Sequence, residues 1–299
     1  MTLTMQSTNR LLMVEPASFY ANPQTMATNV YQAPDAEPHE ATFHRALEEF
    51  RVFRDKLVEN GVIVTTIKGD AACPDAVFPN GFSTHADGRL FIYPMLNENR
   101  QKERIPALLD ALARAYPHVK DWTGYEAEGL SLESTASICM DRANKIGYAG
   151  LSSRTDRALV KKWCAEMDYE PVIFETQSHK GPPVYHTDCL MYIGTSMAAL
   201  CTPCIAPEDR ERVFSKLSAT HEVLELTMEQ LAAFSGNALE VQGRDGKKML
   251  AISDGAFKAL FSAQSAMIGK HFDGVVSAPL TTLEKYGGGS ARCMLAELF

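Results

Sequence analysis

Apolar side chains recur every three or four residues between residues 38 and 60, and Gly61 follows as a natural end. This spacing predicts an amphipathic helix. Its apolar face comprises Phe43, Ala46, Leu47, Phe50, Phe53 and Leu57. Residues 62–67 are rich in Val, Ile and Thr, which predicts a strand directly after this helix.

The same change from helical spacing to short apolar runs is repeated along the chain. Further helices are predicted at residues 104–116, 155–167, 207–217, 228–234 and 256–267. Further strands are predicted at residues 90–93, 137–140, 146–149, 172–174, 190–193, 198–200, 239–241, 249–252 and 274–277. Helices and strands thus alternate in about five rounds, and no linker divides them, so we expect one α/β domain over residues 1–299. Periodicity alone leaves open a doubly wound sheet or a radial propeller.

The composition is that of a soluble globular protein, with 45% hydrophobic and 22% charged residues among 299. The N-terminus lacks a basic stretch followed by an apolar one, and no apolar run is long enough for a membrane span, so we expect a cytoplasmic protein. The formal charge of -8 disfavours nucleic acid and anionic membranes as partners and favours cationic small molecules.

Seven cysteines without a repeated spacing argue against a disulfide framework. Cys201 and Cys204 form the one close pair. A redox or metal function would fit that spacing, but no second pair accompanies it and an apolar run precedes it. We therefore interpret this pair as structural.

Cys293 follows three consecutive glycines, residues 287–289. Such a run is a poor helix or strand and favours a loop that approaches a ligand closely or adopts positive φ. We expect the thiol to be displayed rather than packed. The alternative is a surface tail, which a base or carboxylate elsewhere in the chain would disfavour, because a nucleophilic cysteine needs such a partner.

A histidine and an aspartate stand two positions apart before a predicted strand, at His186 and Asp188. In an extended segment these positions share a face, so both side chains would point into one cavity. Glu133 lies beside an apolar leucine and before another strand, where a carboxylate needs a cationic partner. An ordinary ion pair and a turn cap are the alternatives.

Two further segments have the composition of binding loops. Residues 74–85 combine turn formers with aromatic and polar groups, including Asp75 and Asn80. Arg154 lies between a strand and a helix N-terminus, where a guanidinium can hold a carboxylate in a two-pronged contact. A plain turn and an exposed arginine are the alternatives.

Together these segments resemble the guanidine-modifying enzyme superfamily, which includes arginine deiminases, dimethylarginine hydrolases and amidinotransferases. The resemblance rests on four motifs that occur in the order seen in that superfamily: Leu132-Glu133, residues 150–155, Tyr185-His186-Thr187-Asp188 and residues 287–293. Residues 14–22 and 74–85 add to it. The similarity spans nearly the whole chain and is greatest to the citrulline-utilisation hydrolases.

The resemblance implies a five-bladed α/β propeller (pentein) of ββαβ-type units around a central polar channel. It implies that Cys293 is the nucleophile, that His186 is the general acid and base, that Glu133 and Asp188 hold the guanidinium, and that Arg154 binds the α-carboxylate. These roles are chemically consistent, because a planar cation matches bidentate carboxylates and a covalent thiolate adduct divides one hard step into two.

The expected ligand is an arginine- or citrulline-like small molecule, with Asp75 and Asn80 as additional binding residues. The resemblance implies neither a metal nor an organic cofactor, and it leaves a homo-oligomer open.

Asn80 departs from the superfamily's deiminases, which usually carry an aspartate in this loop. Because asparagine can donate to a ureido oxygen, it favours a citrulline hydrolase or an arginine dihydrolase. Asp188 retains a charge that suits a guanidinium, so both substrate types remain open. Ser134 and Ala136 also replace glycines of related proteins, which makes the geometry of Glu133 harder to predict.

We therefore expect a cysteine-dependent C–N hydrolase that acts on the guanidino or ureido group of such substrates and releases ammonia. The alternatives are an amidinotransferase with an amine acceptor and a non-catalytic sensor of arginine-like ligands.

Overall fold

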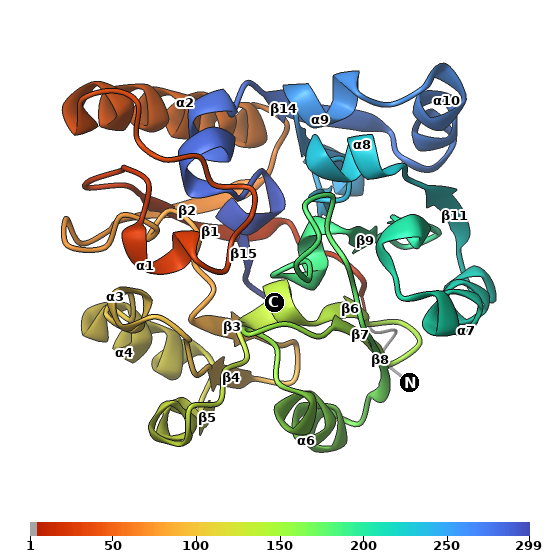
Figure 1. Cartoon of the computed structure of the whole chain (residues 1–299), viewed down its shortest axis with the longest axis horizontal. Helices are drawn as coiled ribbons and strands as arrows, with labels where there is room; N and C mark the ends of the chain where they lie inside the picture. Colours follow the sequence, from red (N-terminus) through yellow and green to blue (C-terminus); the bar gives the residue numbers. More distant parts are fainter. Residues whose placement is uncertain (1–4) are drawn as a thin grey trace.

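The computed structural model describes residues 5–299, and its strands form five three-stranded sheets. All five sheets have one plan. In each sheet the middle strand pairs antiparallel with one neighbour, called the inner strand here, and parallel with the other. Figure 1 shows the sheets following one another round the molecule in the order of the sequence. The fold is thus a mixed α/β fold of five similar units.

Four sheets are built from consecutive segments, with a helix before the third strand. They contain β3 (Phe82–Thr84), β4 (Arg89–Ile92), α4 (Pro106–Ala115) and β5 (His118–Asp121); β6 (Cys139–Asp141), β7 (Ile146–Gly150), α6 (Arg157–Met167) and β8 (Glu170–Phe174); β9 (Met191–Ile193), β10 (Met197–Leu200), α7 (Pro207–Ser218) and β11 (Glu222–Glu225); and β12 (Leu239–Gln242), β13 (Lys248–Ser253), α9 (Asp254–Lys258), α10 (Ser262–His271) and β14 (Gly274–Ala278).

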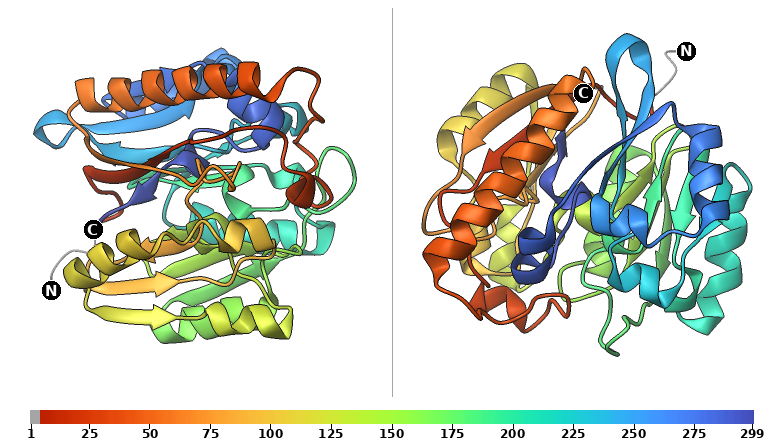
Figure 2. Two further views of the ribbon diagram at one scale, coloured as in Figure 1. Left: turned by 90° about the vertical axis from the view of Figure 1, so that its left-hand side faces the viewer. Right: turned by 90° about the horizontal axis from the view of Figure 1, so that it is seen from above.

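The fifth sheet joins segments from both ends of the sequence. In it, β1 (Arg10–Glu15) runs parallel to β2 (Ile63–Lys68) and antiparallel to β15 (Ala296–Glu297). The helix α2 (His39–Glu59) lies along this sheet and also contacts β14, as Figure 2 shows. This sheet therefore holds the segment just after Cys293 against the N-terminal strand.

The inner strands of the sheets, which include β3, β6, β9 and β15, lie toward the middle of the molecule (Figure 1). There β15 contacts β3, β6 contacts β9, and β9 contacts β12. Four short helices lie in the connections: α1 (Pro23–Met26), α3 (Glu98–Gln101), α5 (Ser134–Ser137) and α8 (Met228–Ala232). Loops that leave the central strands can therefore bring distant residues together.

Most of the predicted elements are confirmed, with shifts at their ends. At the start of α6, the Asp156 carboxylate accepts hydrogen bonds from the N–H groups of Ala158 and Leu159, so Asp156 is the cap. The predicted helix at 256–267 is wrong, because the chain divides there into α9 and α10. The Gln264 side chain accepts a hydrogen bond from the N–H of Phe261 and so begins a second helix.

A buried ion cluster lies among the central strands. The carboxylate of Glu297 is 3.3 Å from the Arg142 guanidinium and 3.2 Å from that of Arg292. All three side chains are less than one-tenth exposed, and buried charges are tolerated only when they are paired.

No helix within residues 5–299 has the length and apolar character needed to cross a membrane.

Glu297→Ala should lower the free energy of unfolding by about 3 kcal/mol, because two buried guanidinium groups lose their carboxylate. Urea unfolding measures this loss. The matched control is Glu175→Ala, which removes the half-exposed partner of Arg157 and should cost less than about 1 kcal/mol. Equal losses in the two variants would show that the central cluster is not a special determinant of stability.

Candidate active site

A narrow buried pocket contains five of the seven residues that the sequence suggests for the site. Its lining comprises Asn29, Asp75, Phe78, Asn80, Arg100, Arg154, Tyr185, His186, Gly287 and Cys293. Its volume is about 10 Å³, so it must widen before a molecule as large as an amino acid enters. Glu133 lies directly behind His186, and Asp188 lies on the other side of Cys293.

The glycines that precede Cys293 pack very closely against neighbouring side chains. Gly288 has φ +62°, and a Cβ there would lie 2.6 Å from the side chain of Asn29. A Cβ on Gly287 would lie 2.6 Å from the Phe78 ring. The prediction of positive φ is thus confirmed at Gly288, and the close contacts of these glycines are with neighbouring side chains. The expectation of a displayed thiol is wrong, since the same close packing leaves Cys293 only 4% exposed.

The Cys293 sulfur lies among groups that favour its thiolate form. Asn237 Nδ2 donates to Sγ over 3.2 Å. The hydrogen bond from Cys189 lowers the pKa of Cys293 most, burial opposes it, and the Ser290 backbone N–H and Asn237 add to the lowering, to about 6. A large fraction of Cys293 is therefore thiolate at neutral pH, as a nucleophile requires.

His186 and Glu133 form a buried pair. His186 Nε2 lies 2.7 Å from Glu133 Oε2, and the same oxygen is 3.6 Å from Arg154 Nη1 and 4.0 Å from Arg100 Nη1. Burial opposes ionisation of Glu133, but Arg154, His186 and Arg100 bring the pKa of this carboxyl to about 2. Glu133 is thus an anion that accepts the Nε2 hydrogen of His186.

The other ring nitrogen of His186 is available for proton transfer. Within residues 5–299, Nδ1 meets no hydrogen-bonding partner. Burial lowers the pKa of His186 to about 4 in spite of the neighbouring Glu133 carboxylate. At neutral pH the ring is therefore uncharged, with its Nδ1 lone pair ready to accept a proton.

The backbone after Glu133 adopts a conformation that suits glycine. Ser134 has φ +54°, and its hydroxyl donates to the carbonyl of Phe82 over 2.7 Å. This left-handed conformation is unfavourable for a residue with a Cβ. The Glu133 N–H donates to the Ser137 hydroxyl over 2.9 Å. These two contacts hold the backbone that carries the Glu133 carboxylate in place.

Asp75 supplies an incompletely bonded carboxylate to the pocket. Its Oδ2 accepts hydrogen bonds from Asn22 at 2.8 Å and Thr25 at 3.0 Å. Its Oδ1 has no partner within residues 5–299, although the side chain is only 2% exposed. Asn80 lines the same pocket. The predicted binding loop therefore faces His186 and Cys293 with one charged and one neutral polar residue.

Two arginines enter the pocket, and sequence reasoning missed one of them. Both oxygens of Glu103 accept hydrogen bonds from Arg100, whose Nη1 lies near Glu133. The predicted Arg154 is held by Thr28, whose hydroxyl accepts a hydrogen bond over 2.9 Å. Arg100 belongs to the short polar helix α3 and had no distinguishing local signal.

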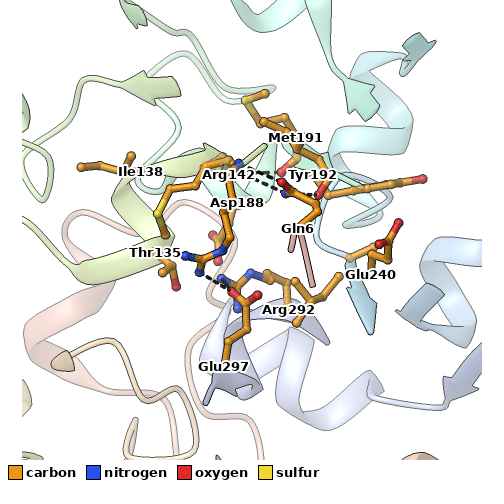
Figure 3. Close-up of a pocket in the computed structure, with 15 residues that line it drawn as sticks. Gln6, Thr135, Ile138, Arg142, Asp188, Met191, Tyr192, Glu240, Arg292 and Glu297 are labelled. Carbon is orange, nitrogen blue, oxygen red and sulfur yellow. Dashed lines mark hydrogen bonds and ion pairs between the residues drawn. The ribbon is translucent and has the colours of Figure 1, made fainter. Parts of the chain in front are cut away.

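Asp188 does not point into the cavity that His186 lines. Residues Thr187–Cys189 form a 3-10 turn rather than an extended segment, so the prediction that positions 186 and 188 share a face is wrong. Asp188 instead lines a second pocket with Arg142, Arg292 and other central residues (Figure 3). Its carboxylate oxygens are 3.8 and 4.0 Å from the Cys293 sulfur. Cys293 therefore lies between the two pockets.

Burial raises the pKa of Asp188 well above its usual range, and the neighbouring Cys293 adds to this. Two anions this close in a buried site disfavour each other.

For metal binding, the part of the chain from residue 5 onward contains no cluster of three or more suitable His, Cys, Asp or Glu side chains.

Alkylation of Cys293 should accelerate as the pH rises through about 6, because the thiolate is the reactive form. Peptide mass spectrometry after short exposure to iodoacetamide measures this rate. Cys164 is the internal control, since burial raises its pKa to about 12 and it should stay unmodified across the same range. A flat profile for Cys293 would contradict the lowered pKa.

One family model matches residues 15–299, that of the eukaryotic N,N dimethylarginine dimethylhydrolases. A comparison with curated proteins finds no match. Among solved structures, the substrate-bound N-terminal domain of ArgZ, an arginine dihydrolase from the ornithine-ammonia cycle in cyanobacteria, is 18% identical with a TM-score of 0.75, over 96% of this chain and 97% of that one.

Two other solved structures give similar results. Unliganded AgrE is 18% identical with a TM-score of 0.78 over 97% of this chain, which spans only 39% of AgrE. A dimethylarginine dimethylaminohydrolase bound to S-methyl-L-thiocitrulline is 16% identical with a TM-score of 0.67, over 97% and 99% of the two chains. These likenesses concern the fold. Because the family model covers nearly the whole sequence, the chain belongs to the N,N dimethylarginine dimethylhydrolase family.

Proposed function

We propose that this protein is a cysteine-dependent hydrolase that cleaves a C–N bond in the guanidino group of an arginine-type amino acid. One observation carries the proposal. A single buried pocket combines a thiol of lowered pKa, Cys293, with the free ring nitrogen of His186 and the unpartnered carboxylate oxygen of Asp75. A nucleophile, a proton carrier and a site for a cation are the groups that this reaction needs.

We also propose an architecture for the region around the pocket. We take residues 1–299 as a single catalytic domain in which the five ββαβ-type units form a five-bladed α/β propeller (pentein) around a central polar channel. The common plan of the five sheets and the contacts among their inner strands support this arrangement. The two pockets on either side of Cys293 would then be successive parts of the channel.

In the first step, the Cys293 thiolate attacks the guanidinium carbon, and an S–C bond forms. The C–N bond to the leaving nitrogen breaks as that nitrogen gains a proton. His186 Nδ1 carries this proton, which it takes from the Cys293 thiol or from the guanidinium itself. Ammonia departs and leaves a covalent adduct on Cys293.

In the second step, water attacks the same carbon. The water gives one proton to His186 Nδ1, and its oxygen bonds to the carbon. The S–C bond then breaks to return the thiolate, while the second proton leaves the oxygen for solvent as the ureido carbonyl forms. The product carries a ureido group in place of the guanidino group. Glu133 stabilises the imidazolium that forms in each step, because its carboxylate lies 2.7 Å from Nε2.

The charges in and around the pocket favour a zwitterionic amino acid. The free Oδ1 of Asp75 suits a cationic guanidinium better than a neutral ureido group. Asp188, within 4.0 Å of the sulfur, would lie beside any amidino group under attack, where a bound cation would lower its raised pKa and favour the charged carboxylate. Arg100 and Arg154 are suited to the ligand's α-carboxylate.

A ureido substrate is the second candidate, and Asn80 is the observation that favours it. Asn80 lines the pocket, and its amide can donate to a ureido oxygen. ArgZ, whose fold is similar, is an arginine dihydrolase. An enzyme of that type would process the ureido product of the first hydrolysis further. The family name adds N-methylated arginines to the substrates to be tested, for which the leaving group would be a methylated amine.

Arginine or an N-methylated arginine should release ammonia or a methylated amine, and Cys293→Ser should abolish the release. Amine detection and mass spectrometry of the products measure this for arginine, methylated arginines, citrulline and agmatine. Agmatine lacks the α-carboxylate and should be a poor substrate because Arg100 and Arg154 lose their partner. Ligand binding without turnover of any compound would favour a sensor, and products that form only with an added amine would favour an amidinotransferase.

Asp75→Asn should lower kcat/KM for the guanidino substrate about 100-fold, because a cation loses its carboxylate partner in a buried site. Any turnover of neutral citrulline should fall much less. Asp70→Asn is the matched control, since Asp70 is exposed on the same loop and caps only the N–H of Ala72. Equal losses for cationic and neutral substrates would contradict a guanidinium-binding role for Asp75.

A further inference from the structure

Asn237 is a buried amide that touches the candidate nucleophile in two ways. Its Oδ1 accepts hydrogen bonds from the backbone N–H groups of Arg292 at 3.0 Å and Cys293 at 3.4 Å. Its Nδ2 donates to the Asp188 carbonyl at 2.9 Å and to the Cys293 sulfur at 3.2 Å. One side chain thus binds both the backbone and the sulfur of residue 293.

The neighbours of Asn237 fix the orientation of its amide. A flipped amide would place an oxygen against the Asp188 carbonyl and an NH₂ group against two backbone N–H groups, so all of these contacts would become repulsive. The hydrogen on Nδ2 must therefore point toward the sulfur. Such a hydrogen bond is stronger to a thiolate than to a thiol.

The loop that carries Asn237 has little freedom to move. Phe234 has φ +62°, an unfavourable conformation for a bulky residue. Gly236 lies so close to the preceding segment that a Cβ there would be 2.6 Å from the carbonyl oxygen of Cys189. The loop is therefore pressed against the turn that contains Asp188, and the position of Asn237 is set by packing.

Several titratable or charged groups surround the same sulfur. They are Asp188 and Cys189 from the turn before β9, Cys139 of β6, Tyr185 and His186 from the preceding loop, and Arg292. Burial disfavours the negative charge on this sulfur, whereas the hydrogen bond from Cys189 favours it. A charged Asp188 and a Cys293 thiolate disfavour each other. A fixed, neutral donor therefore stabilises the thiolate without adding a charge to this crowded site.

We propose that Asn237 is a positioning residue for Cys293, which fixes the sulfur through the backbone of residues 292–293 and stabilises the thiolate through Nδ2. This inference rests on the proposed role of Cys293 as the nucleophile. The same contact assists both steps, since the sulfur is a thiolate before attack and again when it leaves the adduct. Asn237 itself needs no contact with the substrate.

The test is a thiolate titration without substrate. The ultraviolet absorbance of the thiolate, taken as the difference between a chain and its Cys293→Ser form, is followed against pH for wild type, Asn237→Asp and Asn237→Ser. Asn237→Asp keeps the oxygen that accepts from the two backbone N–H groups and loses the Nδ2 donor to the sulfur. Asn237→Ser also loses the Nδ2 donor and adds no charge.

In both variants the thiolate should appear at higher pH than in wild type. Below the wild-type midpoint of about 6, the thiolate fraction should fall about tenfold in Asn237→Asp and severalfold in Asn237→Ser. Ser235→Ala is the control, because Ser235 is buried on the same loop and donates only to the Ala256 carbonyl. Its titration should match that of wild type.

An unchanged midpoint in a folded Asn237→Ser chain would overturn the proposal. A measurement on the unmodified residue decides the case in which both variants unfold. The side-chain amide resonance of Asn237 should shift with the same midpoint as the thiolate absorbance and lose this response in Cys293→Ser. An Asn237 amide chemical shift that does not change with pH would overturn the proposal. Turnover assays test the hydrolase function separately, so either idea can fail alone.

Discussion

The carboxylate of Glu133 is the constraint on which the candidate site depends. It is fully buried, and a buried anion is tolerated only where positive or hydrogen-bonding groups surround it. His186, Arg154 and Arg100 provide these groups from three different units or connections of the fold. Satisfying one charge therefore brings together His186, the proposed proton carrier, and two arginines. The free ring nitrogen of His186 follows from this arrangement, because the carboxylate occupies the other nitrogen.

Some elements of this fold and site can be predicted from the sequence, and others cannot. The helix α2 was predictable because its apolar face is repeated over about four turns, whereas β5 and β11 were missed because they mix charged and apolar residues. Periodicity left the arrangement of units open. The resemblance to a known superfamily suggested it, because the four motifs occur in the order seen there.

The site was predictable where chemistry is local and unpredictable where it depends on packing. Glu133 and His186 stood out beside strands, but the turn at Thr187–Cys189 could not be inferred from the spacing of two residues. Arg100 was missed because its relevance comes from Glu103 and from contacts across the fold. Asn237 likewise gains its importance from a segment more than fifty residues away.

The pairing of β1 with β15 also determines the order in which the chain can assemble. Leu11 pairs with Glu297, so this sheet closes a loop of almost the whole chain, whereas the other four sheets are formed from neighbouring segments. Contacts between residues distant in sequence carry the largest entropic cost and tend to form late in folding. Because β15 follows Cys293 by only a few residues, the thiol is secured near Asp188 when that long loop closes. A chain in which β15 has not yet paired with β1 would therefore not hold the Cys293 sulfur in its place beside Asp188.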